Sequence, residues 1–177
     1  IVLAEPLKSG TLSLLQAATL RGIVRMAMRQ DHHPIKILSA VNQTVNQDPM
    51  NPHFGLSLLI LTPEKDQLSF ISCSYTSLAH LPEGSSSIRT LTTPNPPIGA
   101  DPAAALLETN ANWNSGDLLI LHSLGLSPIA KERDRWMTEH LLLSAQNQAE
   151  KMLQSLTATQ KNLPKQASAV LSIHRIF

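Results

Sequence analysis

Apolar residues near the start of the chain first form a continuous run and then recur with helical spacing. Residues 1–4 are all apolar and predict a buried strand that ends at Glu5-Pro6. Between residues 11 and 30 the apolar positions favour one face, which predicts a helix capped by Thr11. Pro34 suits a first helical turn, so a second helix is predicted from there to Asp48-Pro49.

The middle of the chain has the shorter apolar runs that are typical of strands. Residues 54–62 and 67–74 flank the polar segment 63–66 and predict a hairpin. Further short strands are predicted at residues 88–91 and 118–121. Strand-like patterns therefore replace helical patterns after the second predicted helix.

The remaining segments complete the predicted order of elements. Residues 92–102, with four prolines between 94 and 102, predict an irregular segment that packing holds in order, and residues 103–113 predict a strand. Residues 129–162 predict one long helix that Pro164 closes, and residues 169–176 predict a final strand. Because helices and strands are grouped rather than alternating, the fold class is predicted as α+β, with antiparallel sheets and helices packed outside them.

Composition narrows the class of protein. The 177 residues suit one domain with a sizeable core, and the chain is 42% hydrophobic but only 3% aromatic, so aliphatic side chains must fill that core. The net charge of +1 lacks the basic excess that is typical of nucleic-acid binders. Arg21, Arg25 and Arg29 form one basic stripe on the first predicted helix, interpreted as a solvated face, with an anion or partner site as the alternative.

Cellular context is predicted from what the sequence contains. The single cysteine, Cys73, excludes an internal disulfide and fits a reducing compartment. No apolar run approaches the ~18 residues that span a bilayer, and no export signal is seen, so a cytoplasmic location is expected. Tethering to a membrane sensor outside this chain stays open. Because Ile1 already lies within an apolar run, further N-terminal strands are expected before it.

Six segments follow, in order, the motifs of one bacterial family. They are Ala4–Gly10, Ile37–Asn42, Phe54, Cys73–Tyr75, Pro96–Gly99 and Gly116–Leu126. The last segment closely tracks the family pattern "GDlLlLyTDGl". The chain thus resembles the SpoIIE/RsbU-like branch of the PPM metal-dependent serine/threonine protein phosphatases.

The resemblance implies a fold, a cofactor and a kind of partner. It implies an αββα sandwich covering residues 1–177 as a single domain, which is expected to be part of a larger regulator. Members of this branch dephosphorylate STAS-domain, anti-anti-sigma-factor-like proteins in partner-switching systems. They use two magnesium or manganese ions, bridged by aspartates, to generate a hydroxide in line with the phosphoryl group.

The positions that match the family's metal ligands are altered in this chain. Glu5 stands where the family has an aspartate, Lys8 replaces a glycine, and Leu124 replaces the aspartate at a strand end. Lys165 and Gln166 stand where two aspartates are usual. A two-metal site needs several oxygen ligands and negative charge to offset the ions. The resemblance therefore implies a catalytically impaired pseudophosphatase that acts by protein binding and holds no metal.

Other interpretations stay open at this stage. Glu5, with residues preceding Ile1, can instead supply ligands for one magnesium or manganese ion in an active phosphatase with an atypical site. Glu5 can equally be a surface carboxylate paired with a lysine. A pocket holding Lys8 and Lys165 can accept a phosphoserine, because lysine is a good point-charge partner for phosphate.

Three further hypotheses concern residues outside these positions. Asp117 follows a glycine in a turn and is interpreted as structural. The seven histidines lack the mutual spacing of zinc ligands, so no zinc site is predicted. The predicted helix 129–162, with leucines at 141–143, offers a surface for a homodimer.

Overall fold

The computed structural model divides the chain into two compact units. It describes residues 1–177 except 9, 11, 125–129, 141–142, 160–168 and 177. Unit one comprises Ile1–Leu61, Leu68–Tyr75 and Thr92–Ala111, and unit two comprises Thr62–Gln67, Thr76–Leu91 and Asn112–Phe177. Each unit thus draws on three separate stretches of sequence. The single domain expected over residues 1–177 stays a prediction.

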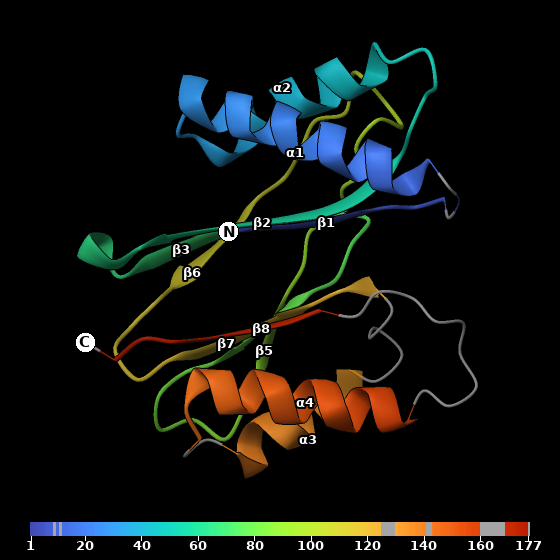
Figure 1. Ribbon diagram of the computed structural model, residues 1–177. Coiled ribbons are helices and arrows are strands. Elements are labelled where there is room, and N and C mark those ends of the chain that lie inside the picture. The colour runs from blue at the N-terminus through green and yellow to red at the C-terminus, as the bar shows by residue number, and fades with distance from the viewer. Residues whose placement is uncertain (9, 11, 125–129, 141–142, 160–168, 177) are drawn as a thin grey trace. The chain divides into compact units, whose positions relative to one another are not determined.

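Unit one consists of a four-stranded sheet, ordered β1-β2-β3-β6, with two helices on one face (Figure 1). Its elements are β1 (Val2–Pro6), α1 (Ser13–Gln30), α2 (Pro34–Asn46), β2 (Phe54–Thr62), β3 (Gln67–Cys73) and β6 (Thr109–Asn112). A short 3-10 turn, Pro63–Lys65, joins β2 to β3 in the predicted hairpin. β1 and β2 pair antiparallel, with Leu3 opposite Ser57 and Glu5 opposite Gly55.

Alternation along β2 builds the core of unit one. Phe54, Leu56 and Leu58 lie on the face that the helices cover, as the period of two in a strand requires. The helices contribute seven further buried members of this core: Leu20, Val24, Ala27, Ile37, Leu38, Val41 and Val45. Its remaining buried members are Ile71, Cys73, Ile98 and Leu106. The predicted amphipathic pattern of both helices therefore positions them on the sheet.

The proline-rich segment is held in place by buried amides, as predicted. The side-chain amide of Asn42 on α2 accepts a 2.8 Å hydrogen bond from Gly99 N–H and donates one of 2.7 Å to Asp101 C=O. Asn95 accepts from Leu107 N–H at 2.8 Å and donates to Leu107 C=O at 2.9 Å. These hydrogen bonds satisfy backbone groups of the segment as well as the two side-chain amides. The segment therefore needs no regular secondary structure of its own.

Unit two repeats the layer scheme with a second sheet, ordered β5-β4-β7-β8, and two helices on one of its faces (Figure 1). Its elements are β4 (Leu78–Leu81), β5 (Arg89–Leu91), β7 (Leu118–His122), α3 (Ala130–Glu139), α4 (Ala145–Thr159) and β8 (Val170–His174). β4 pairs antiparallel with β5 and β7, and β7 with β8. None of the described helices is long and apolar enough to cross a membrane.

The prediction of one long helix over residues 129–162 is wrong. α3 ends at Glu139 and α4 begins at Ala145. Ser144 explains the second start, because its hydroxyl accepts a 3.4 Å hydrogen bond from Asn147 N–H in the manner of an N-cap. Leu143 therefore lies in the connection between two helices rather than on a continuous helical face, while residues 141–142, like Pro164, lie outside the described residues.

Other predicted boundaries also shift. The first strand ends at Pro6, as predicted, but it is half-buried rather than buried. β4, which the sequence did not predict, lies at Leu78–Leu81. Only residues 109–112 of the predicted strand 103–113 are extended. The first helix has no side-chain cap at Leu12, and Thr11 is outside the described residues.

Candidate functional site

Glu5 lies inside the edge strand of unit one. Val2 and Ala4 pack against the core under α1 and α2, so Glu5, which alternates with them, belongs to the opposite face of the sheet. Its side chain is half-buried. The residue that replaces the family aspartate is thus held by a regular ladder.

Lys8 lies just beyond this strand and is exposed. The preceding residue, Leu7, continues the ladder by donating its N–H to His53 C=O at 2.9 Å. Lys8 therefore follows a fixed backbone. Its ammonium group has the freedom of a side chain at the surface.

Leu124 lies two residues beyond the end of β7 in unit two. Residues 118–122 of this strand are all buried, and Ser123 ties the strand end to the start of β8. Ser123 N–H donates to Ala169 C=O at 2.9 Å, and Ala169 N–H donates to the Ser123 hydroxyl at 3.0 Å. Leu124 is half-buried, and its side chain carries no atom that can ligate a metal. Hydrogen bonds thus hold the backbone just before Leu124, and the side chain at that position is aliphatic.

A buried arginine from α3 reaches the same strand end. The Arg133 side chain is 2% exposed, and its Nη1 lies 3.4 Å from Ser77 Oγ and 3.5 Å from His122 Nε2. Its charge is paired with Asp134 at 2.7 Å. The sequence did not predict this residue, because a stretch as charged as KERDR normally indicates a solvated helix.

His122 is neutral beside this arginine. Burial lowers the pKa of His122, and the Arg133 charge adds to that effect, although the Ser123 carbonyl and Asp134 act the other way. Its Nδ1 lies 3.0 Å from the Ser123 carbonyl, which can only accept, so Nδ1 carries the proton and Nε2 faces Arg133 as an acceptor. The end of β7 thus has beside it a buried guanidinium, paired with Asp134, and one neutral imidazole.

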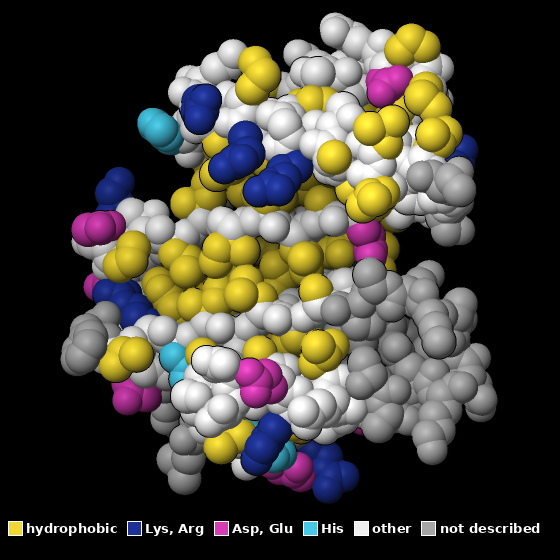
Figure 2. All heavy atoms as spheres, viewed as in Figure 1, with side chains coloured by type: hydrophobic (Ala, Val, Ile, Leu, Met, Phe, Trp, Pro, Cys, Tyr) yellow, Lys and Arg dark blue, Asp and Glu magenta, His cyan; other side chains and the backbone are white. Residues whose placement is uncertain are grey.

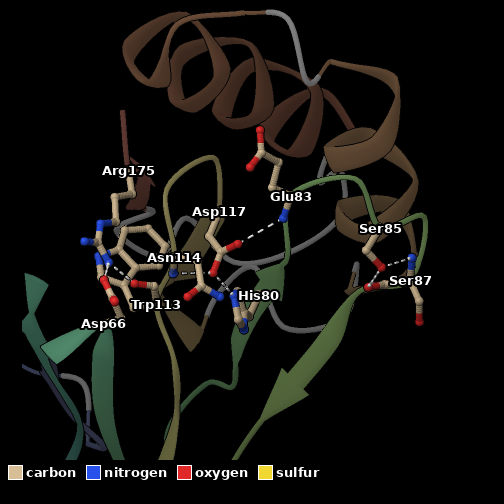
Figure 3. A network of polar contacts seen from close by, with 9 residues as sticks. All are labelled: Asp66, His80, Glu83, Ser85, Ser87, Trp113, Asn114, Asp117 and Arg175. Carbon is tan, nitrogen blue, oxygen red and sulfur yellow. Dashed lines mark hydrogen bonds and ion pairs between the residues drawn. The ribbon is translucent and has the colours of Figure 1, made fainter. Parts of the chain in front are cut away.

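Asp117 lies at the other end of β7 and organises a buried polar network (Figure 3). Its carboxylate accepts hydrogen bonds of 2.9 Å from Asn114 N–H, Glu83 N–H and His80 Nε2. Asp117 and His80 are each 1% exposed. This supports the interpretation of Asp117 as structural, because the carboxylate joins two turns and a strand of unit two.

The same network includes a histidine that the sequence did not single out. His80 Nδ1 is buried and has no hydrogen-bond partner among the described residues. The ring packs near Trp113, with centroids 6.5 Å apart. Asp117 and His80 are 37 positions apart, so no local motif predicts their contact.

The donor set does not fit the two-metal site of the family. Within the described part of the chain, no group of three or more His, Cys, Asp or Glu side chains can hold a metal ion. The residues outside that part, including Lys165 and Gln166, contain no Asp, Glu, His or Cys and cannot add a carboxylate side chain. Hard divalent cations need several oxygen ligands, which one glutamate does not provide.

The predicted site residues fall into both units. Glu5 and Lys8 belong to unit one, and Leu124 belongs to unit two. Lys165 and Gln166 lie outside the described residues. The contacts of unit two bring Arg133, which was not predicted, to the strand end that carries Leu124.

Two sheets with their four described helices define the class of fold, which is that of the PP2C-type (PPM) phosphatase domains. The SiaA-PP2C domain of Pseudomonas aeruginosa matches with a TM-score of 0.82 and 16% identity, covering 98% of this chain and 74% of that one. The RsbU and RsbW domains of a Mycobacterium tuberculosis protein match with a TM-score of 0.76 and 15% identity. That match covers 99% of this chain but only 51% of the mycobacterial one.

A third match is RsbX in complex with magnesium, with a TM-score of 0.74, 16% identity, and coverage of 97% of this chain and 78% of that one. No curated protein sequence matches this chain. The sequence profile of the family described as stage II sporulation protein E (SpoIIE) matches residues 9–171, so the chain belongs to that family. The predicted resemblance and fold class are confirmed.

Proposed function

We propose that this chain is the phosphatase-fold regulatory domain of a bacterial sigma-factor partner-switching system and acts by binding protein rather than by hydrolysis. One observation carries the proposal: Leu124, two residues beyond the end of β7, stands where the family pattern has an aspartate. Glu5 is the single carboxylate retained at the family's ligand positions. A domain with this fold and these residues is a pseudophosphatase.

The charges at the strand end of β7 support the proposal. Arg133 places a buried guanidinium beside His122, two residues before Leu124. In a medium of low dielectric constant, a fixed positive charge opposes the approach of a divalent cation. Asp134 pairs with this guanidinium at 2.7 Å and offsets part of that effect, so the strand end is less favourable for magnesium than one lined by carboxylates.

The proposed partner is a STAS-domain, anti-anti-sigma-factor-like phosphoprotein. Lys8 and Lys165 replace a glycine and an aspartate of the family pattern and add two positive charges, which suit a phosphoserine. We further propose that the domain is cytoplasmic and belongs to a larger regulator. Tethering of that regulator to a membrane sensor is compatible with this proposal.

Metal binding tests the loss of catalysis directly. We expect manganese at millimolar concentration to leave the thermal unfolding of the domain unchanged and to give no heat of binding in calorimetric titration, because too few oxygen ligands converge. The alternative is an active phosphatase in which Glu5 helps to hold magnesium or manganese, and the magnesium complex of the structurally similar RsbX favours it. The proposal is contradicted if manganese binds with micromolar affinity, if Glu5→Ala abolishes that binding, and if Glu64→Ala, at an exposed turn, preserves it.

Phosphoprotein binding tests the role of the two lysines. A purified STAS-domain protein, serine-phosphorylated and unphosphorylated, serves as the probe. The domain is expected to bind the phosphorylated form more tightly and to release no phosphate from it, with or without manganese. Release of phosphate that depends on manganese identifies an enzyme and overturns the proposal.

Charge reversal sharpens this test. Lys8→Glu with Lys165→Glu is expected to weaken binding of the phosphorylated probe at least about tenfold, because hydrogen bonds to charged groups are worth about 1.5–3 kcal/mol. Lys36→Glu with Lys151→Glu changes the net charge equally at two exposed positions and is the matched control. Equal affinities of the two double variants refute the lysine pocket.

A further inference from the structure

A carboxylate and an aromatic ring belong to the same face of the sheet in unit one, the face that α1 and α2 do not cover. Glu5 lies directly opposite Gly55 in the ladder between β1 and β2. Opposite residues of an antiparallel pair point to the same face, with their Cβ atoms about 4.5–5.5 Å apart. Phe54 and Leu56, the neighbours of Gly55, pack on the helix side, so position 55 faces the side of Glu5.

The ring of Tyr75 takes the place of a side chain at position 55. A Cβ on Gly55 would lie 2.5 Å from Tyr75 Cδ2 and 3.2 Å from Tyr75 Cε2. Because Gly55 and Glu5 form a cross-strand pair, the ring stands beside the Glu5 side chain. A strand that pairs with the outer edge of β1 extends the sheet in its own plane and leaves this face as it is.

The backbone before Tyr75 fixes the position of the ring. β3 ends at Cys73, and Ser74 has a φ of +43°, in the left-handed region that favours glycine. The C=O of Asn95 holds this bend, because it accepts hydrogen bonds from Ser74 N–H at 3.0 Å and from the Ser74 hydroxyl at 3.3 Å. Strained backbone of this kind is concentrated at ligand sites. The bend therefore pre-organises the ring beside Glu5.

A carboxylate beside an aromatic ring suits the guanidinium of an arginine. One carboxylate can accept two parallel hydrogen bonds from a guanidinium, and the face of the ring attracts the same cation. A divalent metal ion needs several oxygen ligands instead, which Glu5 alone does not provide. Glu5 and Tyr75 are both half-buried, so each keeps surface that a partner side chain can reach.

Positive charges nearby suit a phosphate on the same segment of the partner. Lys8 follows Glu5 by three residues, a distance of at most about 11 Å along the chain. Arg21, Arg25 and Arg29 of α1 are exposed, and Figure 2 shows basic side chains gathered over that helix. These charges favour a phosphorylated segment over a purely basic one.

We propose that Glu5 and Tyr75 bind an arginine of the partner that lies two residues from its phosphoserine. Alternate residues of an extended chain point to the same side about 6.7 Å apart, so the phosphate and the guanidinium can both face the domain. The inference rests on the proposed phosphoprotein recognition and adds which sequence around the phosphoserine is selected. The carboxylate at a metal-ligand position of the family then binds an organic cation.

Peptides test this selection without altering the protein. Two labelled ten-residue peptides carry a central phosphoserine and, two residues away on both sides, either arginine or citrulline, which has nearly the same shape and no charge. Titrated with the complete chain and followed by fluorescence anisotropy, the arginine peptide is expected to bind at least about fivefold more tightly. Equal binding of the two peptides overturns the inference and leaves phosphoserine recognition standing. Binding of neither also overturns it, and the STAS-domain phosphoprotein then decides the proposed function separately.

Substitutions in the chain locate the bound arginine. Glu5→Gln and Tyr75→Leu are each expected to reduce the preference for arginine to less than about twofold, without changing the affinity for the citrulline peptide. Tyr75→Phe retains the ring and is expected to keep the preference, as is Glu64→Gln, the charge control at an exposed turn. An unchanged preference in Glu5→Gln overturns the inference. Competition between millimolar manganese and the arginine peptide would assign Glu5 to a metal and overturn it as well.

Discussion

Replacing Asp117 with alanine is expected to lower the free energy of unfolding by about 3–5 kcal/mol, the range found when one partner of a buried ion pair is removed. The substitution leaves the N–H groups of Asn114 and Glu83 without their acceptor, and it leaves His80 without its partner. Each buried donor left unsatisfied costs about 1–3 kcal/mol. Urea unfolding followed by tryptophan fluorescence measures the effect, since Trp113 and Trp136 both lie in unit two.

Asp48→Ala is the control for this prediction. Asp48 is half-buried and accepts a single 2.9 Å hydrogen bond, exposed to solvent, from Met50 N–H, so its loss is expected to cost less than about 1 kcal/mol. If Asp117→Ala costs no more than Asp48→Ala, the network of Figure 3 does not stabilise unit two.

The pH dependence of stability gives a second readout of the Asp117 carboxylate. Burial alone raises the pKa of Asp117, but the hydrogen bonds from Asn114, Glu83 and His80 outweigh it and bring the pKa below its ordinary value of 3.8. A carboxyl group with a lowered pKa in the folded state stabilises the protein above its unfolded pKa, and that contribution is lost as the pH falls through the folded value. The difference between the native chain and Asp117→Ala is therefore expected to narrow below about pH 3.8 and to be constant near neutrality.

The elements that the sequence predicted well are those whose pattern is local. The hairpin at residues 54–73 has two mainly apolar strands around a polar turn, and Pro34 lies at the start of a strongly periodic helix. The two helices α3 and α4 were merged because the residues between them, HLLLS, keep an apolar pattern that favours a helix. A single hydroxyl, that of Ser144, supplies the second start, and such a cap is easily missed inside an apolar segment.

The residues of the candidate site also fall into two groups: those that a local pattern predicts and those that it does not. Motif matching could place Glu5, Lys8 and Leu124 because each lies within a segment that follows the family pattern. It could not find Arg133 or His80, whose roles depend on partners far away in sequence. Arg133 contacts Ser77 across 56 positions, and its burial contradicts the general tendency of arginine to lie at the surface. Long-range contacts of this kind have no periodicity that a linear pattern can reveal.

Replacing Gly99 with alanine is expected to destabilise unit one by about 3–5 kcal/mol. Gly99 has a φ of +90°, which strains any residue with a Cβ, and its N–H donates to Asn42 Oδ1. An added Cβ would lie 2.4 Å from Pro52 O and 2.7 Å from Val45 Cγ1. Both neighbours are fixed, one by the backbone and the other by the core, so overpacking adds to the conformational strain.

Gly84→Ala separates these two contributions. Gly84 also has a positive φ, +68°, but a Cβ there meets no atom within 4 Å. Its substitution is expected to cost only the conformational strain, about 1–2 kcal/mol. Urea unfolding by far-UV circular dichroism compares both variants with the native chain. If the Gly99→Ala protein is as stable as the Gly84→Ala protein, the proline-rich segment can move away from α2. The hydrogen bonds of Asn42 then do not fix the position of that segment.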